Sequence, residues 1–319
     1  MSHEVEMVDG VAQMAYAGDV PWHGLGTKVS PDLTPGQIME KAGLDWEVKK
    51  YNSFIEVNKK RVRTGHQSLV RSSDNKVLTN VGPGWNPVQN AEAFEFFHEF
   101  VQAGDMEMHT AGSLKDGQMV WALAKVKESF DIFGGDKVDS YLLFSNPHQY
   151  GKSIDIRFTP IRVVCNNTLT MSLSGQAKNG VRLSHRSVFD GNLVKETMGL
   201  AHDKFDDYRK AAEFLGSRKV TANDLIYYFS EVFPKTSGKK EVEKVEDLSR
   251  NAQLAYDALD KQPGAEFAEG SYWQAFNAVT YVTDHLQGRN DDNRLYNSWF
   301  GGNQTRKVKA MNLAMEMAK

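Results

Sequence analysis

Cysteine is almost absent from this chain. Cys165 is the only one among 319 residues, which excludes an intramolecular disulfide and a zinc site built from several cysteines. Free cysteine without disulfide partners is typical of a reducing compartment. We therefore expect the protein in the cytoplasm.

A dominant charge sign and long hydrophobic runs are also lacking. The 38 basic and 41 acidic residues give a net charge of −3, so a nucleic-acid site, if there is one, must be a local basic patch. No apolar run approaches the roughly 20 residues of a membrane helix, and the first ten residues are too acidic and polar for a signal peptide. We expect no membrane association.

Local catalytic motifs are missing as well. The sequence contains no nucleophile elbow, no HExxH and no paired cysteines, and residues 24–28 lack the spacing of a phosphate-binding loop. We therefore predict no catalytic residue, no metal site and no cofactor. Whether the protein is an enzyme stays open, because a triad assembled from distant segments leaves no local pattern.

The sharpest structural signal lies in residues 151–175. Ile154, Ile156 and Phe158 alternate with polar residues, as in a half-buried strand. Thr159-Pro160 is typical of a helix start, and the apolar spacing that follows fits one helical face up to Gly175. We predict a strand that leads into a helix. The many β-branched residues after Pro160 favour a second strand instead, and that alternative stays open.

Two arginines flank this junction. If a helix begins at Pro160, Arg157 and Arg162 lie near its N-terminus, where free N–H groups attract anions such as phosphate. The alternative is that both arginines pair with Asp155 or another carboxylate.

Periodicity elsewhere predicts an α+β fold, with a mainly antiparallel sheet and some helices in the N-terminal part and a helical C-terminal region. We expect an α+β domain over residues 1–188 and a helical region over 189–319, with a charged connection near 235–246. The predicted strands are 46–57, 61–71, 76–78, 106–112, 118–127, 137–145, 153–159 and 180–188. The predicted helices are 34–43, 88–103, 194–215, 221–233, 247–261, 271–286 and 305–319.

The predicted sheet is basic although the whole chain is not. Cations that follow a sugar-phosphate backbone and aromatic rings that stack on bases are the usual elements of a single-strand site. The candidate nucleic-acid-binding residues are Lys59, Lys60, Arg61, Arg63, Arg157, Arg162, Arg182, Arg186, Trp22 and Trp85. A solvated, lysine-rich hairpin tip that protects a sheet edge explains the first four equally well.

Three motifs together resemble a known family. They are DVPWHGLGT at residues 19–27, RVVCNNTL at 162–169, and FNAVT at 276–280 followed by Asp284-His285 and residues 299–301. They are similar to the phage/plasmid-like proteins built on a domain of unknown function. The resemblance implies a protein of a phage or other mobile element, acting in the host cytoplasm. It carries over no active-site residue.

We therefore expect a protein that binds single-stranded nucleic acid, DNA in particular, and anneals strands in recombination or replication. The layout is similar in outline to phage annealing proteins, which implies a homo-oligomer. One alternative is a metal-dependent nuclease or nucleotide-modifying enzyme using Asp284, His285, Asp291 and Asp292. Another is a host-factor-binding protein that docks through the apolar seam of 194–215, although packing within the chain explains that seam too.

Overall fold

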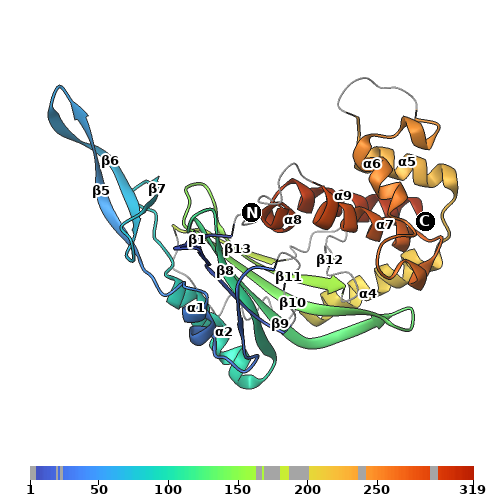
Figure 1. Cartoon of the computed structure of the whole chain (residues 1–319), viewed down its shortest axis with the longest axis horizontal. Helices are drawn as coiled ribbons and strands as arrows, with labels where there is room; N and C mark the ends of the chain where they lie inside the picture. The colour runs from blue at the N-terminus through green and yellow to red at the C-terminus, as the bar shows by residue number, and fades with distance from the viewer. Residues whose placement is uncertain are drawn as a thin grey trace. The chain divides into compact units, whose positions relative to one another are not determined.

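The protein has the α+β fold expected from its sequence (Figure 1). The computed structural model describes residues 5–18, 21, 24–162, 167–168, 180–186, 201–235, 242–287 and 294–319. A large sheet of eight strands has the order β12-β11-β10-β9-β8-β3-β4, and β13 also pairs with β11. A separate three-stranded sheet has the order β5-β6-β7, and β1 pairs with β2.

From residue 48 onward, the described strands agree with the predicted ones except after Pro160. Their bounds are β1 (Met7–Val8), β2 (Val11–Ala12), β3 (Met14–Ala17), β4 (Thr27–Val29), β5 (Val48–Val57), β6 (Lys60–Arg71), β7 (Val77–Val81), β8 (Met106–Leu114), β9 (Met119–Ile132), β10 (Asp136–Pro147), β11 (Ile154–Arg162), β12 (Asn167–Thr168) and β13 (Gly180–Leu183). Strands β3 and β4 are parallel, whereas β8 pairs antiparallel with both β3 and β9.

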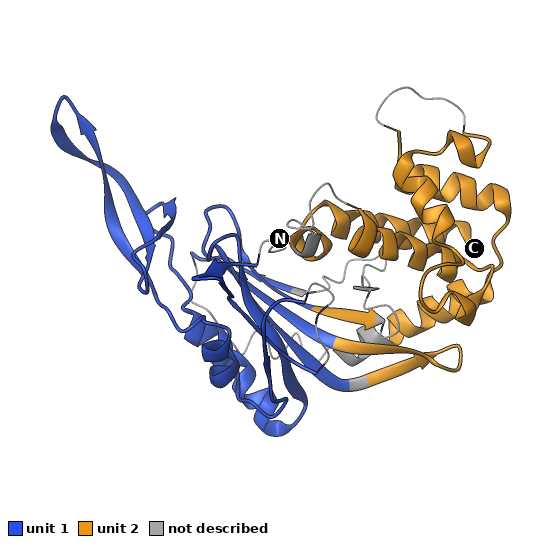
Figure 2. Ribbon diagram, viewed as in Figure 1, with its two compact units in different colours: residues 1–127, 141–157, 180–199 blue, residues 128–140, 158–179, 200–319 orange. Residues whose placement is uncertain are grey.

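Contacts divide the chain into two compact units (Figure 2). Unit 1 contains residues 1–127, 141–157 and 180–199, and unit 2 contains 128–140, 158–179 and 200–319. The chain crosses between the units within β9, β10 and β11. Each unit is therefore built from segments that are distant in the sequence.

Unit 1 has two helices, α1 (Pro35–Lys41) and α2 (Asn90–Ala103). Helix α1 begins with a capping box, in which the Thr34 side chain and Gln37 satisfy each other's backbone N–H groups. Helix α2 buries Phe94 and Phe97, and the Phe97 ring lies edge-on to Phe144 of β10 at 6.0 Å. These aromatic contacts form the core that covers one part of the large sheet.

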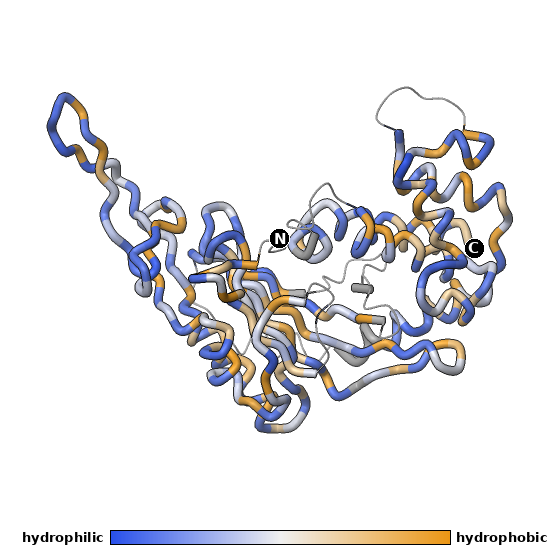
Figure 3. Tube along the Cα trace, viewed as in Figure 1, coloured by the Kyte–Doolittle hydropathy of each residue, from blue (hydrophilic) through white to orange (hydrophobic). Residues whose placement is uncertain are grey.

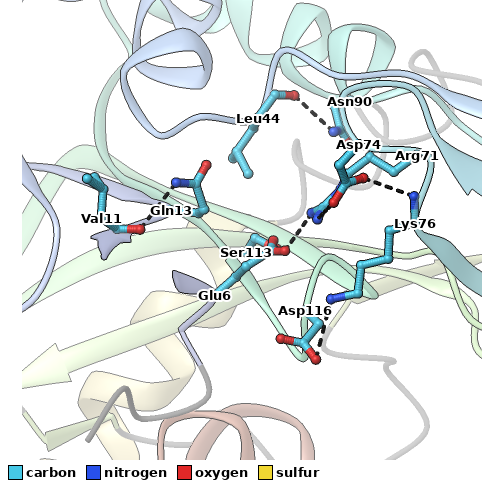
Figure 4. A network of polar contacts seen from close by, with 10 residues as sticks. All are labelled: Glu6, Val11, Gln13, Leu44, Arg71, Asp74, Lys76, Asn90, Ser113 and Asp116. Carbon is cyan, nitrogen blue, oxygen red and sulfur yellow. Dashed lines mark hydrogen bonds and ion pairs between the residues drawn. The ribbon is translucent and has the colours of Figure 1, made fainter. Parts of the chain in front are cut away.

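A buried ion pair joins the small sheet to the rest of unit 1 (Figure 4). Arg71, at the end of β6, places Nη1 2.6 Å from Glu6 Oε1, and its Nη2 lies 2.6 Å from Asp74 Oδ2. The other carboxylate oxygen of Glu6 accepts a 2.8 Å hydrogen bond from Ser113 of β8. Three segments far apart in the sequence are thereby held at one point.

The strand at residues 153–159 is confirmed, but the helix predicted after Pro160 is wrong for the described residues. Strand β11 continues to Arg162 and pairs with β12 through Ile161 and Thr168. On the same edge, β11 pairs with β13 at residues 154–157. Pro160 lies between these two pairings, where its missing N–H removes no hydrogen bond from either. Where the structure describes the stretch after Pro160, at residues 161–162 and 167–168, the chain is a strand, as in the alternative that was left open.

Unit 2 contains α4 (Ala201–Ser217), α5 (Ala222–Val232), η1 (Val245–Asp247), α6 (Arg250–Asp257), η2 (Ala265–Ala268), α7 (Tyr272–Tyr281), η3 (Val282–Leu286), α8 (Arg294–Phe300) and α9 (Gly302–Met317). A capping box at Thr221 opens α5. Helix α4 does not end at Gly216 as expected, because that glycine is helical and lies against the Phe133 ring. A Cβ there would overlap the ring, so close approach explains this glycine.

Candidate nucleic-acid interface

Strands β5 and β6 form a long hairpin that extends away from α1 and α2 in unit 1 (Figure 1). Its two-residue turn, Asn58-Lys59, has φ values of 51° and 60°, as in the type I′ turn that suits a twisted hairpin. At its base, the Gln89 side chain accepts from Val48 N at 2.9 Å and donates to Val48 O at 3.0 Å. The base of the hairpin is thus fixed to the start of α2.

Four predicted site residues gather at the far end of this hairpin. Lys59, Lys60, Arg61 and Arg63 are all exposed in residues 54–63, which we call the distal arm. Among the residues that the structure describes, none of the four forms an ion pair with a carboxylate. They are therefore available to an anionic ligand.

Strand register places two of these cations on the same face as an aromatic ring, and one of them lies over the ring. Phe54 pairs with Arg63 across the hairpin, and Glu56 pairs with Arg61, so these side chains share one face. The Arg61 guanidinium lies 3.9 Å from the centre of the Phe54 ring, and Arg63 Nη2 donates to Asn52 Oδ1 at 2.6 Å. A guanidinium that lies over a ring can still contact a base or a phosphate with its N–H groups.

A groove of about 950 Å³ follows this part of the small sheet. The register between β5 and β6 shifts at Ser53, and Gly65 in the shifted segment has a φ of 79°. The Ser53, Ser68 and Asn80 side chains form one hydrogen-bonded cluster, in which Ser68 Oγ donates to Asn80 Oδ1 at 2.8 Å. The groove is lined by Asn52, Ser53, Phe54, Ile55, Glu56, Arg61, Thr64, His66, Ser68, Val77, Asn80 and Tyr150.

The groove supplies aromatic rings that the sequence prediction did not include. Phe54 and Tyr150 are exposed and line it. Phe54 lies in a strand and Tyr150 in a loop, and the sequence pattern does not tell whether an aromatic residue there is exposed or buried. Their exposure in the folded chain marks them as contact residues. By contrast, Trp85, which was a candidate for stacking on bases, is buried. Its exposed fraction is 6%, and it stacks on His185 with the ring centres 4.1 Å apart. Trp22 lies outside the described residues.

The remaining predicted arginines belong to the large sheet and not to the distal arm. Asp155 of β11 accepts from Arg157 Nε at 2.8 Å and from Arg182 Nε of β13 at 3.2 Å. The carboxylate pairing considered for Arg157 is therefore what the structure contains. Arg186 is exposed in the turn after β13, and the Arg162 side chain is not among those described. No helix begins at Pro160, so the anion site expected there is not formed.

Two buried histidines lie close to the base of the hairpin. His148 Nε2 bonds to Asn90 Oδ1 at 3.0 Å, and His185 Nδ1 bonds to Asn86 O at 3.2 Å. Burial lowers the pKa of His148 to about 3, assisted by the nearby His185, and burial lowers the pKa of His185 to about 4. Both rings are neutral in the folded protein at physiological pH.

Acid should therefore destabilise unit 1. The unfolded chain takes up protons near pH 6.5, whereas the folded rings take them up only near pH 4 and 3. Stability is fully present above about pH 6.5, and below it each ring lowers the free energy of unfolding by about 1.4 kcal/mol per pH unit. Urea unfolding at several pH values, followed by tryptophan fluorescence, measures this slope. His148→Gln should roughly halve it, and the exposed-site control His66→Gln should leave it unchanged.

One of the residues considered for a metal site is held in a buried ion pair. Asp284 pairs with Lys307 of α9, with Nζ 2.8 Å from Oδ1, and both side chains are buried. His285 lies in the same π-helical turn, η3, while Asp291 and Asp292 lie outside the described residues. No group of three or more His, Cys, Asp or Glu side chains suited to a metal occurs in the described ranges.

The apolar seam proposed as a docking surface is used inside unit 2. In the described part of that seam, Tyr208, Ala212 and Leu215 of α4 are buried. The Tyr208 ring lies edge-on to Trp273 of α7 at 6.2 Å. The described part of the seam, from Tyr208 to Leu215, is therefore part of the core. Within the part of the chain that the structure covers, no helix combines the length and the apolar character needed to cross a membrane.

Comparison with known proteins gives a family but no characterised relative. No curated protein and no solved structure matches the chain. The profile of a domain of unknown function, DUF932, matches residues 77–315. The distal arm precedes this stretch, whereas Asp155, Arg157 and the Asp284–Lys307 pair lie within it. Because the match spans most of the chain, this protein belongs to the DUF932 family.

Proposed function

We propose that the protein binds single-stranded DNA through the distal arm and the adjoining groove. The observation that carries this proposal is the exposure of Lys59, Lys60, Arg61 and Arg63 on one hairpin, with no carboxylate partner among the described residues. Such a group of cations attracts a polyanion even though the whole chain is slightly acidic.

Preference for a single strand follows from the groove. Phe54 and Tyr150 can stack on unpaired bases, and the hydroxyl and amide groups of Ser53, Ser68 and Asn80 can bond to base edges. A duplex keeps its bases stacked and paired, so it can use the cations but not the rings. We propose strand annealing as the use of this binding, in a phage or other mobile element within the host cytoplasm, because of the motif resemblance.

Removing the four cations tests the proposal. The variant K59A/K60A/R61A/R63A should bind a labelled single-stranded oligonucleotide at least tenfold more weakly at low salt. The slope of log affinity against log salt should flatten by about 0.7 for each phosphate that the variant no longer neutralises. Fluorescence anisotropy at several salt concentrations measures both quantities.

A matched control separates this site from a general charge effect. The variant K41A/K244A/R250A/K261A loses the same charge at exposed positions elsewhere, and it should bind nearly as tightly as the wild type. Equal losses in both variants would show that the distal arm is not the site. Equal affinity of the wild type for single strand and duplex would remove the role given to the groove.

A further inference from the structure

The small sheet contributes a polar cluster to the groove, and one group of that cluster is left unused. Ser68 of β6 pairs directly with Asn80 of β7, so the two side chains share a face. Both Ser68 Oγ, at 2.8 Å, and Ser53 Oγ, at 3.2 Å, donate to Asn80 Oδ1. Figure 3 shows hydrophilic and hydrophobic residues side by side along the projecting hairpin that forms most of this sheet.

These contacts decide which part of the Asn80 amide is available to a ligand. An amide has one oxygen that accepts and one NH2 group that donates, and the two serine hydroxyl groups occupy the oxygen. Among the residues that the structure describes, none accepts a hydrogen bond from Asn80 Nδ2. Asn80 is exposed and lines the groove. The groove therefore offers a fixed hydrogen-bond donor at this point.

The other polar side chains of the groove do not cancel this donor. His66 also lines the groove, and a neutral imidazole has one donor and one acceptor nitrogen, so it suits any base. Glu56 is the one acidic lining residue. It lies five residues along β5 from Tyr51, which pairs with Ser68, and a rise of about 3.3 Å per residue places it about 16 Å from the level of Asn80. A base beside Asn80 thus meets a donor and no carboxylate.

We propose that Asn80 reads one base of the bound strand and makes the groove prefer thymine to cytosine or adenine. Thymine has a carbonyl oxygen at the position where cytosine and adenine carry an amino group. The oxygen accepts a hydrogen bond from Asn80 Nδ2, whereas an amino group would place two donors face to face and leave both unpaired. The preference rests on the proposed function, because it acts only on a strand that is bound in the groove.

The distal arm and Asn80 act on different parts of the strand. Arg61 pairs with Glu56 across the hairpin, so this cation also lies about 16 Å from the level of Asn80. The cations contact phosphates, which every sequence has, and Asn80 contacts one base. Changing Asn80 to another neutral residue should therefore alter the base preference and leave the salt dependence of binding as it is.

Two probes that differ at the ring carbonyl test the proposal. Uracil has the same carbonyl groups as thymine and the same ring size as cytosine. Fluorescence anisotropy compares labelled oligodeoxyuridylate and oligodeoxycytidylate, each of about 12 nucleotides. The wild type should bind the first about tenfold more tightly, because a buried donor rejects a partner that cannot accept its hydrogen bond.

Two substitutions of Asn80 separate its role from general effects on binding. In N80D, one carboxylate oxygen keeps the two serine contacts and the other replaces the donor with an acceptor, so the preference should reverse in favour of cytosine. The added charge weakens both probes alike and cancels in the ratio of the two affinities. N80T adds no charge and suits a strand. It should bring the ratio to about one with an unchanged salt slope.

The control N223D adds the same charge at an exposed position of α5 and should keep the wild-type ratio. Failure of the wild type to bind either probe would overturn both the proposed function and the base preference. Equal binding of the two probes by the wild type, or a ratio that N80T leaves unchanged, would overturn the base preference alone. If N80D binds neither probe, the ratio measured for N80T decides.

Discussion

Replacing Arg71 with methionine should lower the free energy of unfolding of unit 1 by about 3–5 kcal/mol, the usual cost of removing one partner from a buried ion pair. The Glu6 carboxylate would stay buried with Ser113 as its remaining side-chain partner (Figure 4). The Asp74 carboxylate would lose two hydrogen bonds from the guanidinium. Those bonds lower the pKa of Asp74 to about 2 and raise the pKa of Arg71 above its usual range.

A double-mutant cycle with Glu6→Gln separates the ion pair from packing. Urea unfolding should show that E6Q/R71M is more stable than R71M, because the buried charge that Arg71 compensates is gone. Lys49→Met is the matched control, since Lys49 and Glu47 form an exposed pair at 3.5 Å on the neighbouring strand. It should change stability by less than about 1 kcal/mol. A cost for R71M as small as that of the control would show that the buried pair contributes little.

Lys307→Met should destabilise unit 2 by a similar amount, about 3–5 kcal/mol. Lys307 and Asp284 are both buried, and their atoms lie 2.8 Å apart between α9 and the π-helical turn η3. Helix α9 contacts the same turn through Asn303 Nδ2, which donates to Thr283 O at 2.8 Å. Without the ammonium group, the Asp284 carboxylate loses the charge that compensates its burial.

A lysine two residues away on α9 provides the control. Lys309 pairs with Glu231 at 3.9 Å, with both side chains about half exposed, and Lys309→Met should cost less than about 1 kcal/mol. Urea unfolding followed by circular dichroism compares the two variants. If D284L/K307M is no more stable than K307M, the loss comes from packing of the lysine stem and not from the uncompensated carboxylate.

Elements determined by short-range interactions were predictable. The capping boxes at Thr34 and Thr221 join residues three apart, so the sequence contains both partners within one turn. The alternation that marks β5, β6 and β8 to β10 depends on a two-residue period, which likewise needs no knowledge of distant segments. The short strands β3 and β4 were not among the predicted strands. Their pairing with each other and of β3 with β8 depends on residues outside each strand.

The candidate site was predictable in part. Lys59, Lys60, Arg61 and Arg63 stand out as a basic cluster in a hairpin, and the structure leaves all four exposed. The burial of Trp85 was not predictable, because this ring stacks on His185, which is 100 residues further along the chain. Arg157 and Arg182 become partners of one carboxylate only through the register of β11 and β13.

The sequence by itself therefore determined the α+β class, most helices and strands, and the position of the basic hairpin, because these depend on contacts within a few residues. Tertiary structure decided that the strand β11 continues through Pro160 to Arg162, that Trp85 is buried, and that Phe54 and Tyr150 line a groove. It also decided which charges are buried in pairs and which stay exposed. Burial and pairing depend on segments tens to hundreds of residues apart, and no local pattern specifies which of them meet.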